Sequence, residues 1–151
     1  MRDLTDYLAP CLEHYKSQGI EFECVYSGFL ASENQVDHCL EFFRSYPEAF
    51  KVVDPVMGDH GKPYKTYTKA MQKRMAELVR VADLITPNVT EACILLGEEY
   101  DHNPITRQQA KSMLVRLSEM GPRYVVITGM QLASGTMTNV GYDRERNAFW
   151  M

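Results

Sequence analysis

The sequence lacks the motifs that identify common zinc proteins and membrane proteins. Its cysteines form no C-x-x-C pair and its histidines form no H-E-x-x-H motif, so no zinc site is expected. No apolar run approaches the ~18 residues that a membrane-spanning helix needs, and the charged amino terminus is unlike a signal peptide. The widely spaced cysteines suit a reducing compartment. We therefore expect a cytoplasmic protein without a membrane partner.

An excess of basic residues is also missing. The chain has 16 Lys and Arg against 20 Asp and Glu, which gives a net charge of −4. Binding to nucleic acid depends mainly on cationic contacts to phosphates, so nucleic acid is not an expected partner. With 151 residues, of which 45% are hydrophobic, the chain is long enough for one domain with a buried core.

Segments typical of strands and of helices alternate along the chain. Such alternation predicts right-handed β-α-β crossovers and a mostly parallel sheet with helices on both faces, a three-layer α/β/α architecture. The end of the sequence departs from this pattern and predicts an antiparallel β-hairpin, 136–142 with 147–151. The expected helices are 4–17, 32–46, 67–80, 87–96 and 106–120, and the expected strands are 22–27, 50–53, 83–86 and 124–128.

Two of these strands stop at proline-containing turns that carry carboxylates. Residues 52–59 read VVDPVMGD, and residues 83–97 read DLITPNVTEACILLG. Because the carboxyl ends of parallel strands meet at one edge of a sheet, we expect their polar side chains to converge there. Oxygen donors of this kind suit Mg²⁺, which keeps some waters and shares itself with substrate phosphates. The expected cluster consists of Asp54, Asp59, Asn88 and Glu91.

Each of these motifs also has a simpler explanation. Asp54-Pro55 is a common turn at the end of a strand. Asn88 and Glu91 are three residues apart at a helix start, where a cap and an acidic side chain stabilise the first turn. The presence of both segments in one chain favours the metal–nucleotide interpretation.

The order of the motifs resembles the ribokinase-like vitamin kinases, most closely the pyridoxal kinases. The resemblance covers nearly the whole chain. Hydroxymethylpyrimidine kinases share the D-P-V and T-P-N-x-x-E elements, whereas the Gly58-Asp59 continuation and the tyrosine after it are more typical of pyridoxal kinases. The matching elements are S-G-F-L at 27–30, D-P-V-M-G-D at 54–59, Tyr64, A-D-L-I at 82–85, T-P-N-x-x-E at 86–91 and V-V-I-T-G at 125–129.

The resemblance implies ATP-dependent phosphorylation of the 5′-hydroxyl of pyridoxal, with Mg²⁺ and ATP as cofactors and K⁺ or another monovalent cation as a third. In that family, the positions matching Asp54, Thr86 and Thr128 hold the monovalent cation. The implied metal ligands are Asp54, Asp59, Thr86, Glu91 and Thr128, and the implied nucleotide and phosphate contacts are Asp59, Tyr64, Asn88, Glu91 and Thr128.

The same resemblance implies that Ser27 and Phe29 contact the vitamin. The family has a tyrosine where this sequence has Phe29, so an aromatic face is kept and a hydroxyl is lost. Phe29 fits a core aromatic equally well. Tyr64 fits an ordinary loop residue, with Tyr67 as the alternative phosphate neighbour.

The family's G-x-G-D turn has no counterpart in this sequence. That turn opens a helix and carries both the catalytic base and the backbone N–H groups that bind the transferred phosphoryl group. No glycine follows Gly141, and Asp143 lies in the expected hairpin, so no catalytic base is assigned. The amino-terminal strands of the family also lack counterparts. We therefore expect residues 1–151 to be a single partial kinase domain that is inactive alone.

The complete protein is then expected to be a homodimer that acts on a small molecule. Two alternatives remain open. The chain is either a non-catalytic, degenerate fragment that keeps affinity for a nucleotide, or part of a hydroxymethylpyrimidine or sugar kinase.

Overall fold

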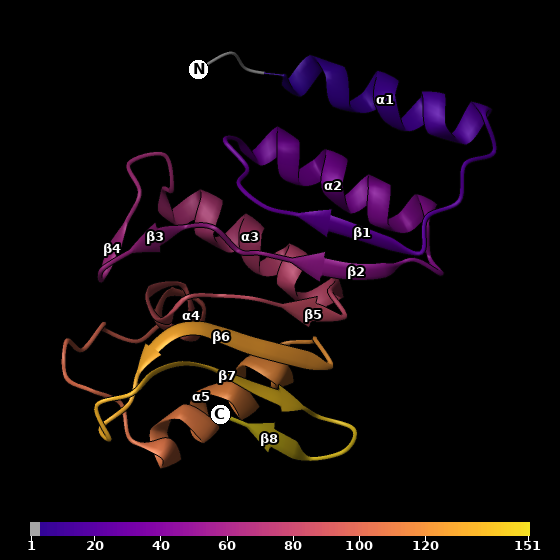
Figure 1. The fold of residues 1–151 in the computed structure, drawn as a ribbon. Coiled ribbons are helices and arrows are strands. Elements are labelled where there is room, and N and C mark those ends of the chain that lie inside the picture. Colours follow the sequence, from indigo (N-terminus) through magenta and orange to yellow (C-terminus); the bar gives the residue numbers. More distant parts are fainter. Residues whose placement is uncertain (1–3) are drawn as a thin grey trace.

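The computed structural model describes residues 4–151 and has a six-stranded sheet flanked by helices (Figure 1). The helices are α1 (Thr5–Ser17), α2 (Glu33–Ser45), α3 (Lys69–Val81), α4 (Val89–Leu96) and α5 (Arg107–Glu119). The strands of the sheet are β1 (Cys24–Ser27), β2 (Phe50–Val53), β5 (Leu84–Ile85), β6 (Tyr124–Gln131), β7 (Met137–Asp143) and β8 (Ala148–Trp150). A separate hairpin pairs β3 (Gly58–Asp59) with β4 (Lys62–Pro63).

The prediction of a mostly parallel α/β fold is confirmed. The strand order is β1-β2-β5-β6-β7-β8, and the first four strands in this order are parallel. The expected hairpin at the end of the sequence is present as β7 and β8, and β7 also pairs with β6 in antiparallel fashion. The short β3–β4 hairpin was not predicted.

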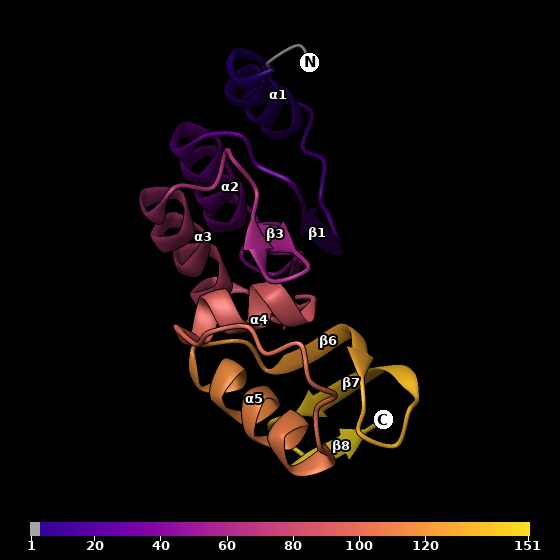
Figure 2. The ribbon, with the colours of Figure 1, turned by 90° about the vertical axis from the view of Figure 1, so that its left-hand side faces the viewer.

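Helices α2 to α5 lie on one face of the sheet, and α1 packs beside α2 beyond the β1 edge (Figure 2). The expected cover on both faces is therefore not formed by residues 4–151, which supply two layers of the predicted three. The strand order gives the reason. From β1 to β6 each crossover moves to the next position in the same direction, and right-handed crossovers that progress in one direction keep their helices on one side.

The core lies between this helical layer and the sheet. Val53, Ile85 and Val125 on three adjacent strands are completely buried, as are Met75 and Leu78 of α3. These residues belong to one continuous cluster that also includes the apolar face of α5. None of the helices within residues 4–151 has the length and apolar character needed to span a bilayer.

The opposite face of the sheet is apolar and lies open. Tyr26 is 61% exposed, Phe50 38% and Trp150 45%. The register places Tyr26 beside Val52 and Val52 beside Leu84, so the apolar side chains form a row across the parallel strands. Parallel sheets normally carry a covering layer on both faces. This face is therefore a surface on which further apolar structure can pack.

Candidate functional site

The carboxyl ends of the parallel strands bring the predicted segments together. The Thr86 N–H donates to the Val53 carbonyl at 3.1 Å, which places the end of β5 beside the end of β2. The Thr128 N–H donates to the Pro87 carbonyl at 2.9 Å, and Thr128 forms a parallel bridge with Asn88. The ends of β2, β5 and β6 therefore lie side by side at the edge of the sheet where we expected the site.

Helix α4 begins with the arrangement that its sequence predicts. The Asn88 side chain accepts a hydrogen bond from the Glu91 N–H at 2.9 Å, and Glu91 Oε2 accepts one from the Asn88 N–H at 2.8 Å. This reciprocal capping box satisfies two of the N–H groups that a helix start leaves unpaired. The capping role expected of Asn88 and Glu91 is therefore confirmed.

The same two side chains also hold the loop that follows β2. Glu91 Oε1 accepts from the Met57 N–H at 3.0 Å, and the Asn88 side-chain amide donates to the Gly58 carbonyl at 2.9 Å. Backbone groups of the D-P-V-M-G-D segment are therefore fastened to the first turn of α4. This explains why the two motifs occur together in one chain.

Glu91 is deeply buried, with 3% of its surface exposed. Burial raises the pKa of its carboxyl group, and the negative charge of Asp54 raises it further, while the N–H groups of Asn88 and Met57 act in the opposite direction. Both carboxylate oxygens accept hydrogen bonds from the backbone. In this structure the buried Glu91 carboxylate therefore holds the backbone of Met57 and Asn88 in place.

Three of the predicted nucleotide-binding residues line one hollow of about 400 Å³. These are Asp59 from β3, Asn88 at the start of α4 and Thr128 from β6. The Asp59 side chain is 52% exposed, and its carboxylate accepts a hydrogen bond from the His60 N–H at 2.8 Å. A half-exposed carboxylate beside amide and hydroxyl groups can bind a hydrated cation or the cation of a metal–phosphate complex.

The donor set around this hollow fits magnesium better than a metal held by protein ligands alone. Within residues 4–151, no group of three or more His, Cys, Asp or Glu side chains could hold a metal ion. Mg²⁺ commonly keeps several waters and binds one or two carboxylates together with phosphate oxygens. Asp59 and Asp101 both line the hollow, so a carboxylate for such a complex is available.

Asp54 lies outside the hollow and has a different partner. Its Oδ2 accepts a hydrogen bond from the Tyr26 hydroxyl at 2.8 Å. Partial desolvation, together with this carboxylate, raises the pKa of Tyr26 to about 12. Asp54 is thereby oriented toward the end of β1, on the other side of β2 from Thr86.

Three further predicted residues do not line the hollow. They are Tyr64, expected to contact phosphate, and Ser27 and Phe29, expected to contact the vitamin. Tyr64 is 43% exposed, whereas Tyr67 is in the core and its hydroxyl donates to the Leu30 carbonyl at 2.7 Å. Phe29 is 45% exposed, which excludes the core explanation, and its ring meets that of Tyr67 edge-on at 6.0 Å. Ser27 Oγ is buried without a hydrogen-bond partner among the described residues.

Several residues of the hollow were not singled out from the sequence. His60, Thr90, Tyr100 and His102 all line it. A signal for the first of them exists, because His60-Gly61 is a two-residue turn between short extended segments. Tyr100 and His102 lie in a loop with no motif and reach the site only through the fold.

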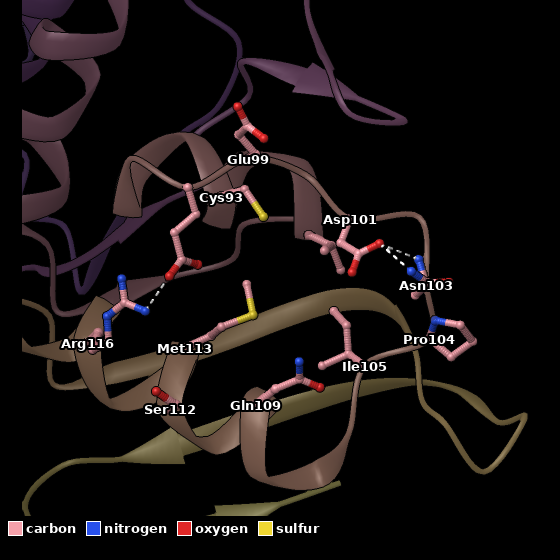
Figure 3. Close-up of a pocket in the computed structure, with 12 residues that line it drawn as sticks. Cys93, Glu99, Asp101, Asn103, Pro104, Ile105, Gln109, Ser112, Met113 and Arg116 are labelled. Atoms are coloured by element: carbon pink, nitrogen blue, oxygen red, sulfur yellow. Dashed lines mark hydrogen bonds and ion pairs between the residues drawn. The ribbon is translucent and has the colours of Figure 1, made fainter.

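A second hollow of about 330 Å³ lies next to the first, between α4, the loop after it and α5 (Figure 3). Cys93 and Met113 form part of its apolar floor. At one end Arg116 pairs with Glu98 at 2.6 Å, and at the other Asp101 accepts two hydrogen bonds from Asn103 (Figure 3). None of the predicted site residues lines this hollow, so the first one is the candidate site.

Comparisons with known proteins identify the family of this chain. A family model for phosphomethylpyrimidine kinase matches residues 6–150. The chain is 36% identical over 125 residues to the chloroplastic thiamine biosynthetic bifunctional enzyme TH1 of Arabidopsis thaliana, covering 82% of this chain and 23% of that protein. It is 26% identical over 139 residues to the pyridoxal kinase PdxY of Deinococcus radiodurans, covering 88% of this chain and 47% of that protein.

Solved structures of kinases assigned to this family also superpose on the chain. A Bacteroides thetaiotaomicron protein assigned as a phosphomethylpyrimidine kinase superposes with a TM-score of 0.93 at 34% identity, covering 99% of this chain and 52% of that one. An orthorhombic crystal form of that protein, obtained with pyridoxal, superposes with a TM-score of 0.89 at 33% identity, covering 99% of this chain and 53% of that one. The chain thus spans about half the length of these relatives, or less.

Proposed function

The chain belongs to the phosphomethylpyrimidine kinase family, and from this premise we propose that the complete protein transfers a phosphoryl group from ATP to the 5′-hydroxyl of pyridoxal. Residues 4–151 would supply the part that binds Mg²⁺ and the nucleotide phosphates. The observation that carries the proposal is the convergence of Asp59, Asn88 and Thr128 on one hollow at the carboxyl ends of the strands.

The residues of this site have distinct tasks in the proposal. Asp59 binds the hydrated Mg²⁺, which would neutralise charge on the β- and γ-phosphates during transfer. The first turn of α4 contributes positive potential that favours a phosphate. Asn88 and Thr128 orient the phosphate groups, and Glu91 keeps the loop that carries Asp59 in place.

The remaining predicted residues are assigned to neighbouring tasks. The monovalent cation is assigned to Asp54, Thr86 and Thr128 from the family resemblance, and Asp54 would have to leave the Tyr26 hydroxyl to join the two threonines. Ser27 and Phe29 face the vitamin, and the unpaired, buried Ser27 Oγ supports this assignment because such a group usually has a partner. Tyr64, exposed on the loop after β4, would reach the phosphates when that loop closes over the nucleotide.

The base that accepts the hydroxyl proton is not assigned to any residue of this chain. General base catalysis typically contributes roughly 10²–10⁴-fold, and one anion-hole donor a further ~10²–10³-fold. We therefore expect residues 1–151 alone to form no pyridoxal phosphate from ATP.

A chimera tests the proposal directly. Residues 1–151 replace the matching half of the B. thetaiotaomicron protein, which superposes closely on this chain. The chimera should form pyridoxal phosphate from ATP and Mg²⁺, and the same chimera with Asp59→Asn should be strongly impaired. The isolated chain serves as the inactive control. A folded chimera without pyridoxal kinase activity, or one unaffected by Asp59→Asn, would contradict the proposal.

Phosphorylation of hydroxymethylpyrimidine is the second candidate. Two observations favour it, namely the matching family model and the similarity to the thiamine biosynthetic enzyme of A. thaliana. The chimera assayed with both substrates distinguishes the two, because the preferred one has the higher kcat/KM. Activity toward neither, combined with Mg-nucleotide binding by residues 1–151, would support a non-catalytic nucleotide-binding fragment.

We also propose that the complete protein is a homodimer, an expectation that rests on the resemblance to the family. Analytical ultracentrifugation of the folded chimera tests this point. A monomer at all concentrations would contradict it.

A further inference from the structure

The hairpin that carries Asp59 is small and needs support. β3 and β4 contain two residues each, and isolated two-stranded hairpins are at best marginally stable in water. The turn residues His60 and Gly61 have φ angles of +49° and +77°, which is the left-handed pair of a type I′ turn. Contacts from outside the hairpin must therefore fix its direction.

Thr90 supplies one such contact. Its Oγ1 accepts a hydrogen bond from the Gly61 N–H at 2.9 Å, and the residue is 3% exposed. The cap of α4 uses the side chains of Asn88 and Glu91 for its reciprocal hydrogen bonds. The Thr90 hydroxyl is thus directed to the hairpin turn and not to the start of its own helix.

Tyr100 supplies a second contact to the turn. Its ring packs so closely on Gly61 that a Cβ atom there would lie 2.7 Å from Tyr100 Cδ1. The ring also meets that of His102 edge-on, at 5.0 Å between centroids. Tyr100, Thr90 and Asp59 all line the same hollow.

We propose that Thr90 and Tyr100 are positioning residues for Asp59 in the metal–nucleotide site. Together they hold the His60-Gly61 turn against the start of α4, so that the Asp59 carboxylate stays at the hollow before a ligand binds. Preorganisation of this kind strengthens binding because less freedom is lost when the ligand arrives. This inference rests on the proposed function, since it assigns the support of that same site.

The test measures ADP binding to residues 1–151 by calorimetry as Mg²⁺ is varied. Thr90→Val keeps the volume and removes the acceptor, and it should raise the Mg²⁺ concentration for half-maximal ADP binding about tenfold, because the partly buried N–H of Gly61 loses its partner. Thr90→Ser restores a hydroxyl and should return that concentration to within about twofold of the original value. Tyr100→Leu should act in the same direction as Thr90→Val.

Two further variants separate positioning from a general loss of stability. Thr106→Val removes the cap of α5, at a residue that does not line the hollow, and should lower the melting temperature without changing the Mg²⁺ dependence. Asp59→Asn removes the group that is positioned. In the Asp59→Asn background, Thr90→Val should change the Mg²⁺ dependence by less than about twofold, since coupled residues are not additive.

The outcomes separate a failure of the proposed function from a failure of the positioning role alone. An unsubstituted chain that binds no Mg-ADP overturns the proposed function, and with it the role of Thr90. Normal binding by the unsubstituted chain, combined with an equal effect of Thr90→Val with and without Asp59, overturns the positioning role alone. Failure of Thr90→Ser to restore the Mg²⁺ dependence also overturns it.

Discussion

At the scale of single residues, the buried carboxylates of Glu91 and Asp143 each hold two backbone N–H groups in place. Glu91 accepts two backbone hydrogen bonds from inside the core, as described above. Asp143, at the end of β7, accepts hydrogen bonds from the N–H groups of Glu145 and Arg146 and contacts the Arg123 guanidinium at 3.3 Å. Asp143 therefore organises the β7–β8 turn, a position that agrees with its place in the predicted hairpin.

Replacing Asp143 with asparagine should remove a pH dependence of stability. Desolvation opposes ionisation of this carboxyl, but Arg123 and the backbone N–H groups outweigh it and lower the pKa. The unfolded chain, with a pKa of about 3.9, then binds more protons in acid than the folded one, so this contribution is present above about pH 4 and is lost below it. Urea unfolding from pH 7 to pH 3 should show a smaller acid loss for Asp143→Asn. An exposed control, Glu48→Gln, should keep the original profile.

Glu91→Gln should lower the free energy of unfolding by about 1–3 kcal/mol, because a side-chain amide places an N–H₂ group against a buried backbone N–H. Urea unfolding at pH 7 measures this change. The matched control is Glu119→Gln at the exposed end of α5, which should change stability by less than about 0.5 kcal/mol. Equal effects of the two substitutions would contradict the supporting role of Glu91.

At the scale of elements, sequence signals predicted the helices better than the short strands. Helix α5 begins after Thr106 with a capping box, and α4 ends at Gly97, which has a φ of +69°. Such side-chain and glycine signals are local and can be read from the sequence. The β3–β4 hairpin has only the short His60-Gly61 turn as a local signal and is supported by Thr90 and Tyr100, and the last residues of β6 pair with β7, so neither was predicted. Gly129, with a φ of +60°, interrupts the apolar pattern of β6 where its register shifts.

In the candidate site, too, local sequence signals indicated some residues and only the fold revealed others. Asp59 and Asn88 were predicted from motifs that follow strands, and Thr128 from the family resemblance. Tyr100 contributes to the site through packing on Gly61, which no local pattern encodes. Sequence reasoning therefore proposes the residues that would bind a ligand, and the structure is needed to find the residues that support them.

The β7–β8 hairpin offers a test with an intrinsic probe. The indole of Trp150, the single tryptophan of the chain, lies so close to Gly141 that an added Cβ would be 2.0 Å from its Cε2 atom. Gly141→Ala should displace the indole into solvent and shift its fluorescence emission to longer wavelength. Gly135→Ala is a control at a turn with open space around it, although its φ of +85° costs some stability. An unchanged spectrum for Gly141→Ala would contradict the packing.

At the scale of the whole molecule, the open apolar face of the sheet dominates the expected behaviour in solution. Exposed apolar patches on soluble proteins mark interaction surfaces or promote association. The aromatic residues Tyr26, Phe50 and Trp150 extend this patch from the β1 edge to the β8 edge. The patch lies opposite the helical layer and outside the candidate site.

Residues 1–151 alone should bind the dye ANS and self-associate as concentration rises. Phe50→Lys combined with Trp150→Lys should reduce both effects, since each places a charge on the patch and neither removes a buried side chain. Sedimentation velocity and ANS fluorescence provide the measurements. A control with Lys at Val81, an exposed apolar residue of α3 in the helical layer, should keep the association. A monomer that does not bind ANS would contradict the importance of this face.

The antiparallel arrangement of β6, β7 and β8 has a consequence for the order of folding. Residues 132–136 and 144–147 connect these three strands, so their pairing requires the closure of short loops, whereas each parallel pair must wait for an intervening helix. Loop-closure entropy favours the more local contacts early in folding. We expect the meander with α5 to form the folding nucleus and the edge strand β1 to join last. Pulsed hydrogen exchange during refolding should then protect the amides of β6 and β7 first, and substitutions in β1 should mainly accelerate unfolding.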